Sequence, residues 1–232
     1  MGEEGIPVLI TIEGIDGSGK STLVTALHEP LADLEPVFTR EPGSTWVGDA
    51  VRRAIAEKAD PVTEALLFVA DHAAHLENVV RPALGEGRLV ISDRYTDSRY
   101  AYQAAMLEGW IPDHAKVRDR PGGKGAPPGM VPDPVGWLRA LHDGWTIVPD
   151  RTFLLLVPVE KALERLPPDK RREHFEDGPF LGKVHRNYLA LAEAEPSRFV
   201  LVDALLPAKE IRLFVENGIR ELARRPRSRR RR

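Results

Sequence analysis

Short runs of apolar residues alternate along the chain with longer stretches whose apolar residues recur at helical spacing. The strand-sized runs cover residues 8–12, 37–39, 88–92, 151–157 and 199–202. The helical patterns cover residues 20–34, 47–58, 63–84, 98–108, 135–141, 159–166, 180–195 and 208–222. Continuous apolar runs of this length are typical of strands that are buried on both faces. We therefore predict an α/β fold with a five-stranded parallel sheet and helices on both faces.

Two segments interrupt this alternation, and one follows it. Residues 111–134 are rich in Pro, Gly and charge, which predicts a long inserted loop, and Pro and charge also dominate residues 167–177. Neither segment separates two cores, so we expect a single domain over residues 1–223. Residues 224–232 hold seven arginines and no acidic residue. We expect this tail to be disordered and solvated, although such a sequence can also bind nucleic acid.

Composition narrows the classes of protein that are possible. The chain of 232 residues contains no cysteine, which excludes disulfides, thiolate catalysis and Cys-ligated metal sites. The longest apolar runs are too short to span a bilayer, and residues 1–14 lack the basic start of a signal peptide. The net charge of −2 conceals an acidic body, because 26 basic residues face 35 acidic ones once the tail is set aside. We expect a cytoplasmic protein.

The strongest motif lies between the first strand and the first helix. Residues 14–21 read GIDGSGKS and fit the phosphate-binding pattern G-x-x-x-x-G-K-[ST]. Its glycines allow backbone N–H groups to surround phosphates, Lys20 would neutralise the β- and γ-phosphates, and the Ser21 hydroxyl would bind Mg²⁺. The predicted ATP-binding residues are Gly14, Asp16, Gly17, Ser18, Gly19, Lys20, Ser21 and Thr22. The motif alone does not separate kinases from other P-loop NTPases.

Charged residues at the ends of two further strands indicate a second phosphate. Asp93 and Arg94 directly follow the strand at 88–92, and Arg40 follows the strand at 37–39. Ligands of open α/β sheets bind at the carboxyl ends of the strands. Asp93 could therefore hold Mg²⁺, and an arginine is suited to hold a phosphate through two hydrogen bonds. An isolated Asp-Arg pair would favour a surface ion pair, but two arginines beside a phosphate loop favour an acceptor phosphate separate from ATP.

At this point the sequence resembles the thymidylate kinases, which are P-loop nucleoside monophosphate kinases. The segments EGIDGSGKST, TREPGST, LLFVADHAAH, VISDRYTDSRYAYQA and REHFEDGPFLGKVHRNYLALA follow in the order and spacing of that family. The resemblance extends over residues 8–202 and is interrupted by the loop at 111–134. It implies transfer of the γ-phosphate of ATP to dTMP, with Mg²⁺ as the cofactor and a homodimer as the usual assembly.

The resemblance also implies roles for individual residues. Asp16 matches the acid near the acceptor sugar, and Arg40 and Arg94 match the arginines that hold the acceptor phosphate. Phe68 matches the aromatic residue that stacks on thymine, although core packing would be the ordinary interpretation of this residue alone. The segment that follows Arg94 contributes Ser98, Tyr102 and Gln103 to the same substrate site. Tyr102 would disfavour a 2′-hydroxyl.

Two positions, Gly17 and His72, separate this chain from parts of the family. Gly17 stands where one subclass carries an arginine in the phosphate loop. In the other subclass the arginine comes from the mobile LID segment, here residues 167–177, so Arg171 or Arg172 is expected to join Lys20 and Arg94 in catalysis. His72 stands where the family usually places an arginine that hydrogen-bonds the base. The predicted substrate-binding residues therefore include His72, and we expect weaker discrimination for thymine.

Two alternatives stay open at this stage. The first is a related kinase with another nucleotide or a nucleoside as its acceptor, but a nucleoside would need a base to take its proton. The second is a P-loop binding or regulatory protein that has lost catalysis and whose arginine tail engages nucleic acid. The intact set of Lys20, Ser21, Asp93 and Arg94 argues against the second alternative.

Overall fold

The central sheet of the computed structural model, which describes residues 7–110, 131–167 and 178–224, has five strands. Their order across the sheet is β2-β3-β1-β4-β5, and every neighbouring pair is parallel. The strands are β1 (Val8–Glu13), β2 (Val37–Arg40), β3 (Leu89–Asp93), β4 (Arg151–Leu156) and β5 (Phe199–Asp203). The prediction of a five-stranded parallel sheet is therefore confirmed.

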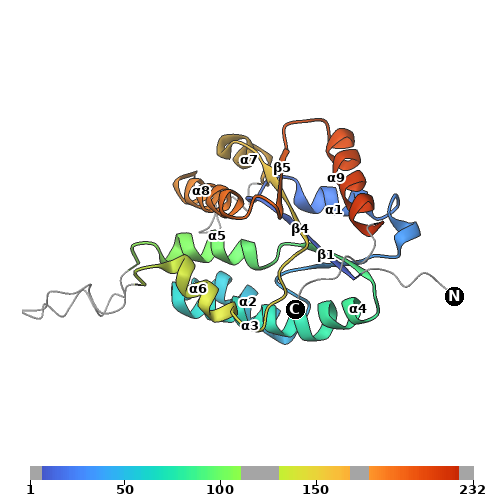
Figure 1. Cartoon of the computed structure of the whole chain (residues 1–232). Helices are drawn as coiled ribbons and strands as arrows, with labels where there is room; N and C mark the ends of the chain where they lie inside the picture. The colour runs from blue at the N-terminus through green and yellow to red at the C-terminus, as the bar shows by residue number, and fades with distance from the viewer. Residues whose placement is uncertain (1–6, 111–130, 168–177, 225–232) are drawn as a thin grey trace, which may run out of the picture.

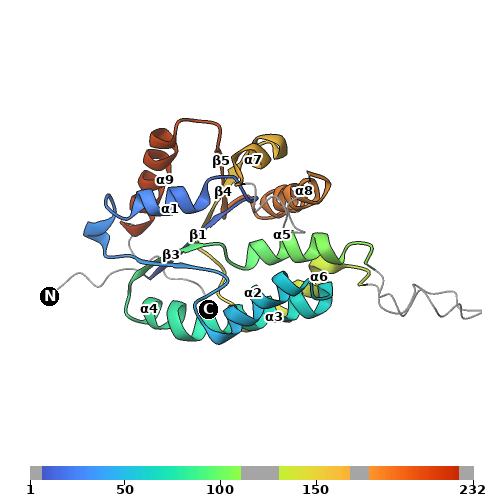
Figure 2. The ribbon, with the colours of Figure 1, turned by 180° about the vertical axis from the view of Figure 1, so that it is seen from behind.

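Helices cover both faces of this sheet (Figures 1 and 2). They are α1 (Lys20–Leu27), α2 (Trp46–Glu57), α3 (Pro61–His75), α4 (Arg81–Gly85), α5 (Thr96–Leu107), α6 (Pro134–His142), α7 (Val159–Arg165), α8 (Gly178–Ala194) and α9 (Ala208–Ala223). Helices α1 and α9 lie on one face, whereas α4 and α5 lie on the other (Figure 1). Strands β1, β3 and β4 are largely buried between these helices, and most of their residues are apolar. The carboxyl ends of β1, β2 and β3 thereby meet at one edge, where the site is built.

Two predicted helices differ clearly in their bounds, and a proline lies close to each difference. The helix expected over residues 20–34 ends at Leu27, and a 3₁₀ turn, η1 (Ala32–Leu34), follows. Pro30 has no N–H group and cannot continue a helix. The helix expected over 63–84 is divided into α3, a π-helical turn η2 (Leu76–Val80) and α4. Pro82 lies in the first turn of α4, where a missing N–H group costs no helical hydrogen bond.

Parts of the predicted loop, LID and tail lie outside the described residues. The excluded positions are 1–6, 111–130, 168–177 and 225–232, and they include Arg171 and Arg172. The end of the predicted loop is described, and there the Asp133 carboxylate accepts the Gly136 N–H at 2.9 Å and caps α6. Within the ranges that the structure covers, no helix combines the length and apolar composition required to cross a membrane.

Candidate active site

The phosphate loop connects β1 to α1 through three glycines whose φ angles are positive. Gly17 has φ +79° and Gly19 has φ +96°, a region that residues with a Cβ atom rarely adopt. Lys20 folds back over the loop, and its Nζ donates to the Ile15 carbonyl at 2.8 Å. Burial, together with the charge of Arg94, lowers the pKa of Lys20 to about 8. An anionic phosphate at this position would favour the charged ammonium group again.

Ser21 and Asp93 form a pair of oxygen ligands beside the loop. The Ser21 hydroxyl donates to Asp93 Oδ2 at 2.7 Å, which links the first turn of α1 to the end of β3. The other carboxylate oxygen, Asp93 Oδ1, is buried and has no hydrogen-bond partner among the described residues. Hydroxyl and carboxylate oxygens are the ligands that Mg²⁺ prefers. The pair therefore has the donor set and the free oxygen that a magnesium ion would require.

Arg94 lies between the phosphate loop and α5 in a left-handed backbone conformation, with φ +68°. Such a conformation is unusual for a residue with a side chain and is frequent at functional sites. The guanidinium donates to the Gly14 carbonyl at 3.3 Å and to Ser98 Oγ at 3.2 Å, and it forms an ion pair with Asp16. Although burial alone would raise the pKa of Asp16, the charges of Arg94 and Lys20 hold it at about 2.

A buried carboxylate, Glu13, accepts hydrogen bonds from three groups close to Arg94. Its Oε1 accepts the Tyr95 backbone N–H at 2.7 Å, and its Oε2 accepts the hydroxyls of Ser98 at 2.6 Å and Tyr188 at 2.8 Å. Burial, with a contribution from the charge of Asp97, raises the pKa of Glu13 to about 7. Sequence reasoning missed Glu13, yet a carboxylate at the end of an otherwise apolar strand was a signal that could have found it.

A cavity of about 150 Å³ opens beside Arg94. Its lining residues are Asp16, Glu41, Pro42, Ile55, Phe68, Arg94, Ser98, Arg99, Tyr102 and Gln103. Six of the predicted substrate-binding residues are therefore brought together, from four different elements or loops. Tyr102 closes the group, because its hydroxyl donates to Asp16 Oδ2 at 3.0 Å and accepts the Asp16 backbone N–H at 2.8 Å.

Two predicted substrate residues do not belong to this lining. His72 is fully buried, and its ring nitrogens lie 2.8 Å from Glu41 Oε1 and 2.8 Å from Thr146 Oγ1. The interpretation of His72 as a contact of the base is wrong for this geometry, because both nitrogens are already engaged inside the protein. Arg40 ends β2 opposite Asp93 of β3, and its side chain is exposed and outside the cavity lining. Its role in holding a phosphate stays a prediction.

A second cavity, of about 330 Å³, lies on the other side of the phosphate loop. Its lining is largely apolar and consists of Ser18, Gly19, Thr22, Leu23, Ala26, Leu155, Arg165, Ala204, Leu206, Ala208 and Ile211. The Arg165 guanidinium is held there by the Ala204 carbonyl at 3.1 Å. Apolar walls beside a phosphate loop suit the base of a donor nucleotide. The sequence motif had indicated only the residues of the loop and Thr22.

Comparison with known proteins shows which family this chain resembles over most of its length. A family model described as thymidylate kinase matches residues 12–112 and 136–215. A protein of Methanoculleus marisnigri named "probable thymidylate kinase" is 59% identical over 96% of this chain and 98% of its own length. Proteins with the same name are 55% identical in Methanospirillum hungatei, over 92% and 94% of the two chains, and 51% identical in Methanocorpusculum labreanum, over 94% and 100%.

Proposed function

Because the chain belongs to the thymidylate kinase family and phosphorylates dTMP to dTDP, we propose how its residues divide that reaction between two cavities. ATP would bind with its base in the cavity beside α1 and its phosphates in the loop at residues 14–21. The acceptor would bind in the cavity beside Arg94. The observation that carries this division is Arg94 itself, since it lies between the phosphate loop and the acceptor cavity.

On the donor side, the charges of the transferring group would be held by Lys20 and by backbone N–H groups of the loop. The ammonium group of Lys20 is already positioned over the loop by the Ile15 carbonyl. Ser21 and Asp93 would hold Mg²⁺, which when bound neutralises charge on the β- and γ-phosphates. The unpartnered oxygen of Asp93 supports this assignment.

On the acceptor side, the phosphate of dTMP would replace Asp16 as the partner of one edge of the Arg94 guanidinium. An arginine offers a planar fork that fits phosphate oxygens, so it fixes the attacking oxygen in direction as well as distance. A monophosphate oxygen is already a competent nucleophile, and the reaction therefore needs no general base. Catalysis then consists of positioning and electrostatic stabilisation.

Several finer assignments stay predictions. Arg171 or Arg172 is proposed as the arginine that stabilises the transferring phosphoryl group, and both lie outside the described residues. Gly17 supports a source of this arginine outside the phosphate loop. A Cβ atom at position 17 would lie 2.2 Å from the Ala162 carbonyl oxygen, so an arginine side chain has no room there. The homodimer, the cytoplasmic location and the single domain over residues 1–223 are likewise proposed.

The assignment of the two cavities is tested by separating the two substrates. We expect Arg94→Ala to raise the KM for dTMP at least tenfold and to leave the dissociation constant for ATP nearly unchanged. Arg139→Ala is a matched control, because that arginine is half exposed on α6, lies outside the cavity lining and makes a 3.3 Å ion pair with Glu195. Turnover would be measured by coupled ADP release across the deoxynucleoside monophosphates, and ATP binding by equilibrium titration. Equal weakening of both substrates would contradict the role of Arg94.

A further inference from the structure

Glu13 is a fully buried carboxylate to which the proposed function gives no role. It is the last residue of β1, it is 0% exposed, and it is absent from the lining of both the acceptor cavity and the cavity beside α1. Acidic side chains are almost never buried to this extent unless they have partners. A residue in this position can influence the reaction only through the groups that it holds.

The first link from Glu13 to Arg94 runs through the backbone. Arg94 has φ +68°, and the two peptide groups that flank it are both tied to β1. The Arg94 N–H donates to the Ile12 carbonyl at 3.1 Å, and the Tyr95 N–H donates to Glu13 Oε1 at 2.7 Å. A left-handed conformation is unfavourable for a residue with a side chain, so it persists only where surrounding contacts maintain it.

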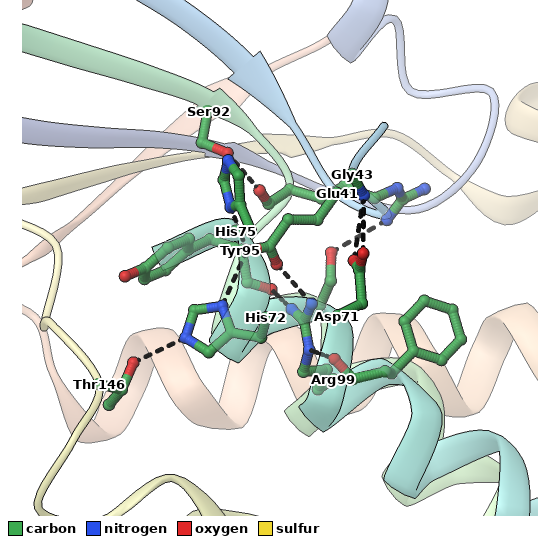
Figure 3. Close-up of polar contacts among 12 residues, drawn as sticks. Glu41, Gly43, Asp71, His72, His75, Ser92, Tyr95, Arg99 and Thr146 are labelled. Carbon is green, nitrogen blue, oxygen red and sulfur yellow. Dashed lines mark hydrogen bonds and ion pairs between the residues drawn. The ribbon is translucent and has the colours of Figure 1, made fainter. Parts of the chain in front are cut away.

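Tyr95 is held on its other sides as well (Figure 3). Its carbonyl accepts from Arg99 Nη1 at 2.8 Å, and its ring lies edge-on to His72 with the ring centres 4.6 Å apart. Tyr95 therefore cannot turn to give its own N–H group another acceptor. Without Glu13 this backbone donor would be buried and unpaired, which is costly in a protein interior.

The second link from Glu13 to Arg94 runs through the side chain of Ser98. Arg94 Nη1 donates to Ser98 Oγ at 3.2 Å, and Ser98 Oγ donates to Glu13 Oε2 at 2.6 Å. A hydroxyl that donates to a carboxylate is polarised and becomes a better acceptor. Asp16 is the partner that the acceptor phosphate would replace, and the Ser98 hydroxyl then remains as a partner of Arg94. Glu13 thus fixes one edge of the guanidinium while the other edge is offered to the phosphate.

The charge of Glu13 and its hydrogen bonds act on phosphate binding in opposite directions. A carboxylate near Arg94 offsets part of the positive charge that attracts an anion, so loss of the charge alone would strengthen binding. Loss of the hydrogen bonds would weaken binding, because recognition of a phosphate by an arginine fork depends on direction. Burial raises the pKa of Glu13 to about 7, so part of the charge is already absent near neutral pH. Oε1 can accept the Tyr95 N–H in either protonation state.

We propose that Glu13 is a positioning residue for the acceptor phosphate, because it holds Arg94 through the Tyr95 N–H group and the Ser98 hydroxyl. This inference rests on the proposed placement of the phosphate at Arg94. Since Glu13 lines neither cavity, its removal should weaken the binding of dTMP and leave the dissociation constant for ATP nearly unchanged.

The test is a double-mutant cycle of Glu13→Ala and Arg94→Ala, measured as the equilibrium dissociation constant for dTMP. Glu13→Ala removes both links, and we expect it to raise this constant roughly tenfold when Arg94 is present. When Arg94 is replaced by alanine, the same substitution should change the constant by less than about twofold, because the residue through which Glu13 acts is gone. Effects that multiply in the double variant would overturn the proposal, since Glu13 would then act independently of Arg94.

Glu13→Gln separates hydrogen bonding from charge. The amide retains an acceptor for the Tyr95 N–H and a polar partner for Ser98, but it carries no charge. The dissociation constant for dTMP should not rise in this variant, and a rise equal to that of Glu13→Ala would overturn the proposal. If Glu13→Ala does not fold, Glu13→Asp takes its place in the cycle. Its carboxylate is set back by one methylene group, about 1.5 Å, and we expect a rise in the same direction.

Tyr188→Phe is the matched control. The Tyr188 hydroxyl donates to the same oxygen, Glu13 Oε2, at 2.8 Å, but among the described residues it has no hydrogen bond to Arg94. Thermal unfolding should show a loss of stability in this variant, whereas the dissociation constant for dTMP should stay within about twofold of the wild-type value. A rise as large as that of Glu13→Ala would show that any disturbance of the carboxylate suffices, and would overturn the proposed route. An Arg94→Ala protein that binds dTMP as tightly as the wild type would instead refute the placement of the acceptor.

Discussion

Replacing Gly17 by alanine should lower the folding stability for two reasons, one conformational and one steric, that glycine avoids in the phosphate loop. The first is conformational, because φ +79° costs about 1–2 kcal/mol for a residue with a Cβ atom. The second is steric, because the new Cβ would lie 2.2 Å from the Ala162 carbonyl oxygen. Carbon and oxygen almost never approach within 3.0 Å without a bond, so the loop and α7 would have to separate by about 0.8 Å. Overpacking of this kind costs about 1–3 kcal/mol more.

Gly19 offers a control in the same loop. Its φ of +96° imposes a similar conformational cost, but a Cβ atom there meets nothing within 4 Å. Gly17→Ala should therefore be less stable than Gly19→Ala by about 1–3 kcal/mol, which for a chain of this size is roughly 2–12 °C in Tm. The comparison is made by thermal unfolding without nucleotide, so that contacts with phosphate do not enter. Equal losses in the two variants would show that the contact with Ala162 does not restrain the loop.

Three further substitutions address charges and burial. Lys20→Ala should lower kcat on the order of a thousandfold at unchanged Tm, because it removes a charge from the transferring group, and near-normal turnover would contradict this. Glu13 has a raised pKa of about 7. The folded protein therefore binds the additional proton between about pH 4.5 and 7, and stability falls as the pH rises through that window. Glu13→Gln should reduce the loss of folding stability between pH 5 and 8 by about 1–3 kcal/mol, as measured by urea unfolding at both pH values. An unchanged pH dependence in this variant would show that Glu13 does not cause the loss. His72→Arg should destabilise the protein by at least about 1–3 kcal/mol, because the ring is fully buried against Tyr95 and Trp145. A stable variant with an altered preference between dTMP and dUMP would restore His72 to the substrate site.

Local patterns in the sequence were sufficient for the sheet and the phosphate loop. Each strand is a short apolar run that ends near its predicted boundary, and residues 14–21 fit one motif whose chemistry depends on consecutive residues. The bounds of α1 and α3 were less predictable. The periodicity of apolar residues continues past Pro30 although α1 ends at Leu27, and it does not reveal the π-helical turn that precedes Pro82.

The acceptor cavity could be predicted only in part, because it depends on pairs that are distant in sequence. The motif around Arg94 identifies residues on one helix, yet it does not say which side chain of α3 faces them. His72 lies four residues after Phe68 and faces β2 and the segment before β4 instead of the cavity. Arg99 lies one residue after Ser98 and reaches Glu41, 58 positions earlier in the chain. Only the packing of α3, α5 and the end of β2 brings these groups together.

The ion pair between Arg94 and Asp16 also has a consequence for the anions that compete for the acceptor site. In the free protein the guanidinium already has a carboxylate partner, and the pKa of that carboxyl, about 2, keeps it ionised at every physiological pH. A small anion such as inorganic phosphate must therefore displace an internal partner and gains nothing else in return. A nucleotide gains contacts along the whole cavity when it does so. The pair would thus keep the site available to nucleotides in the presence of free phosphate, without any group devoted to excluding that anion.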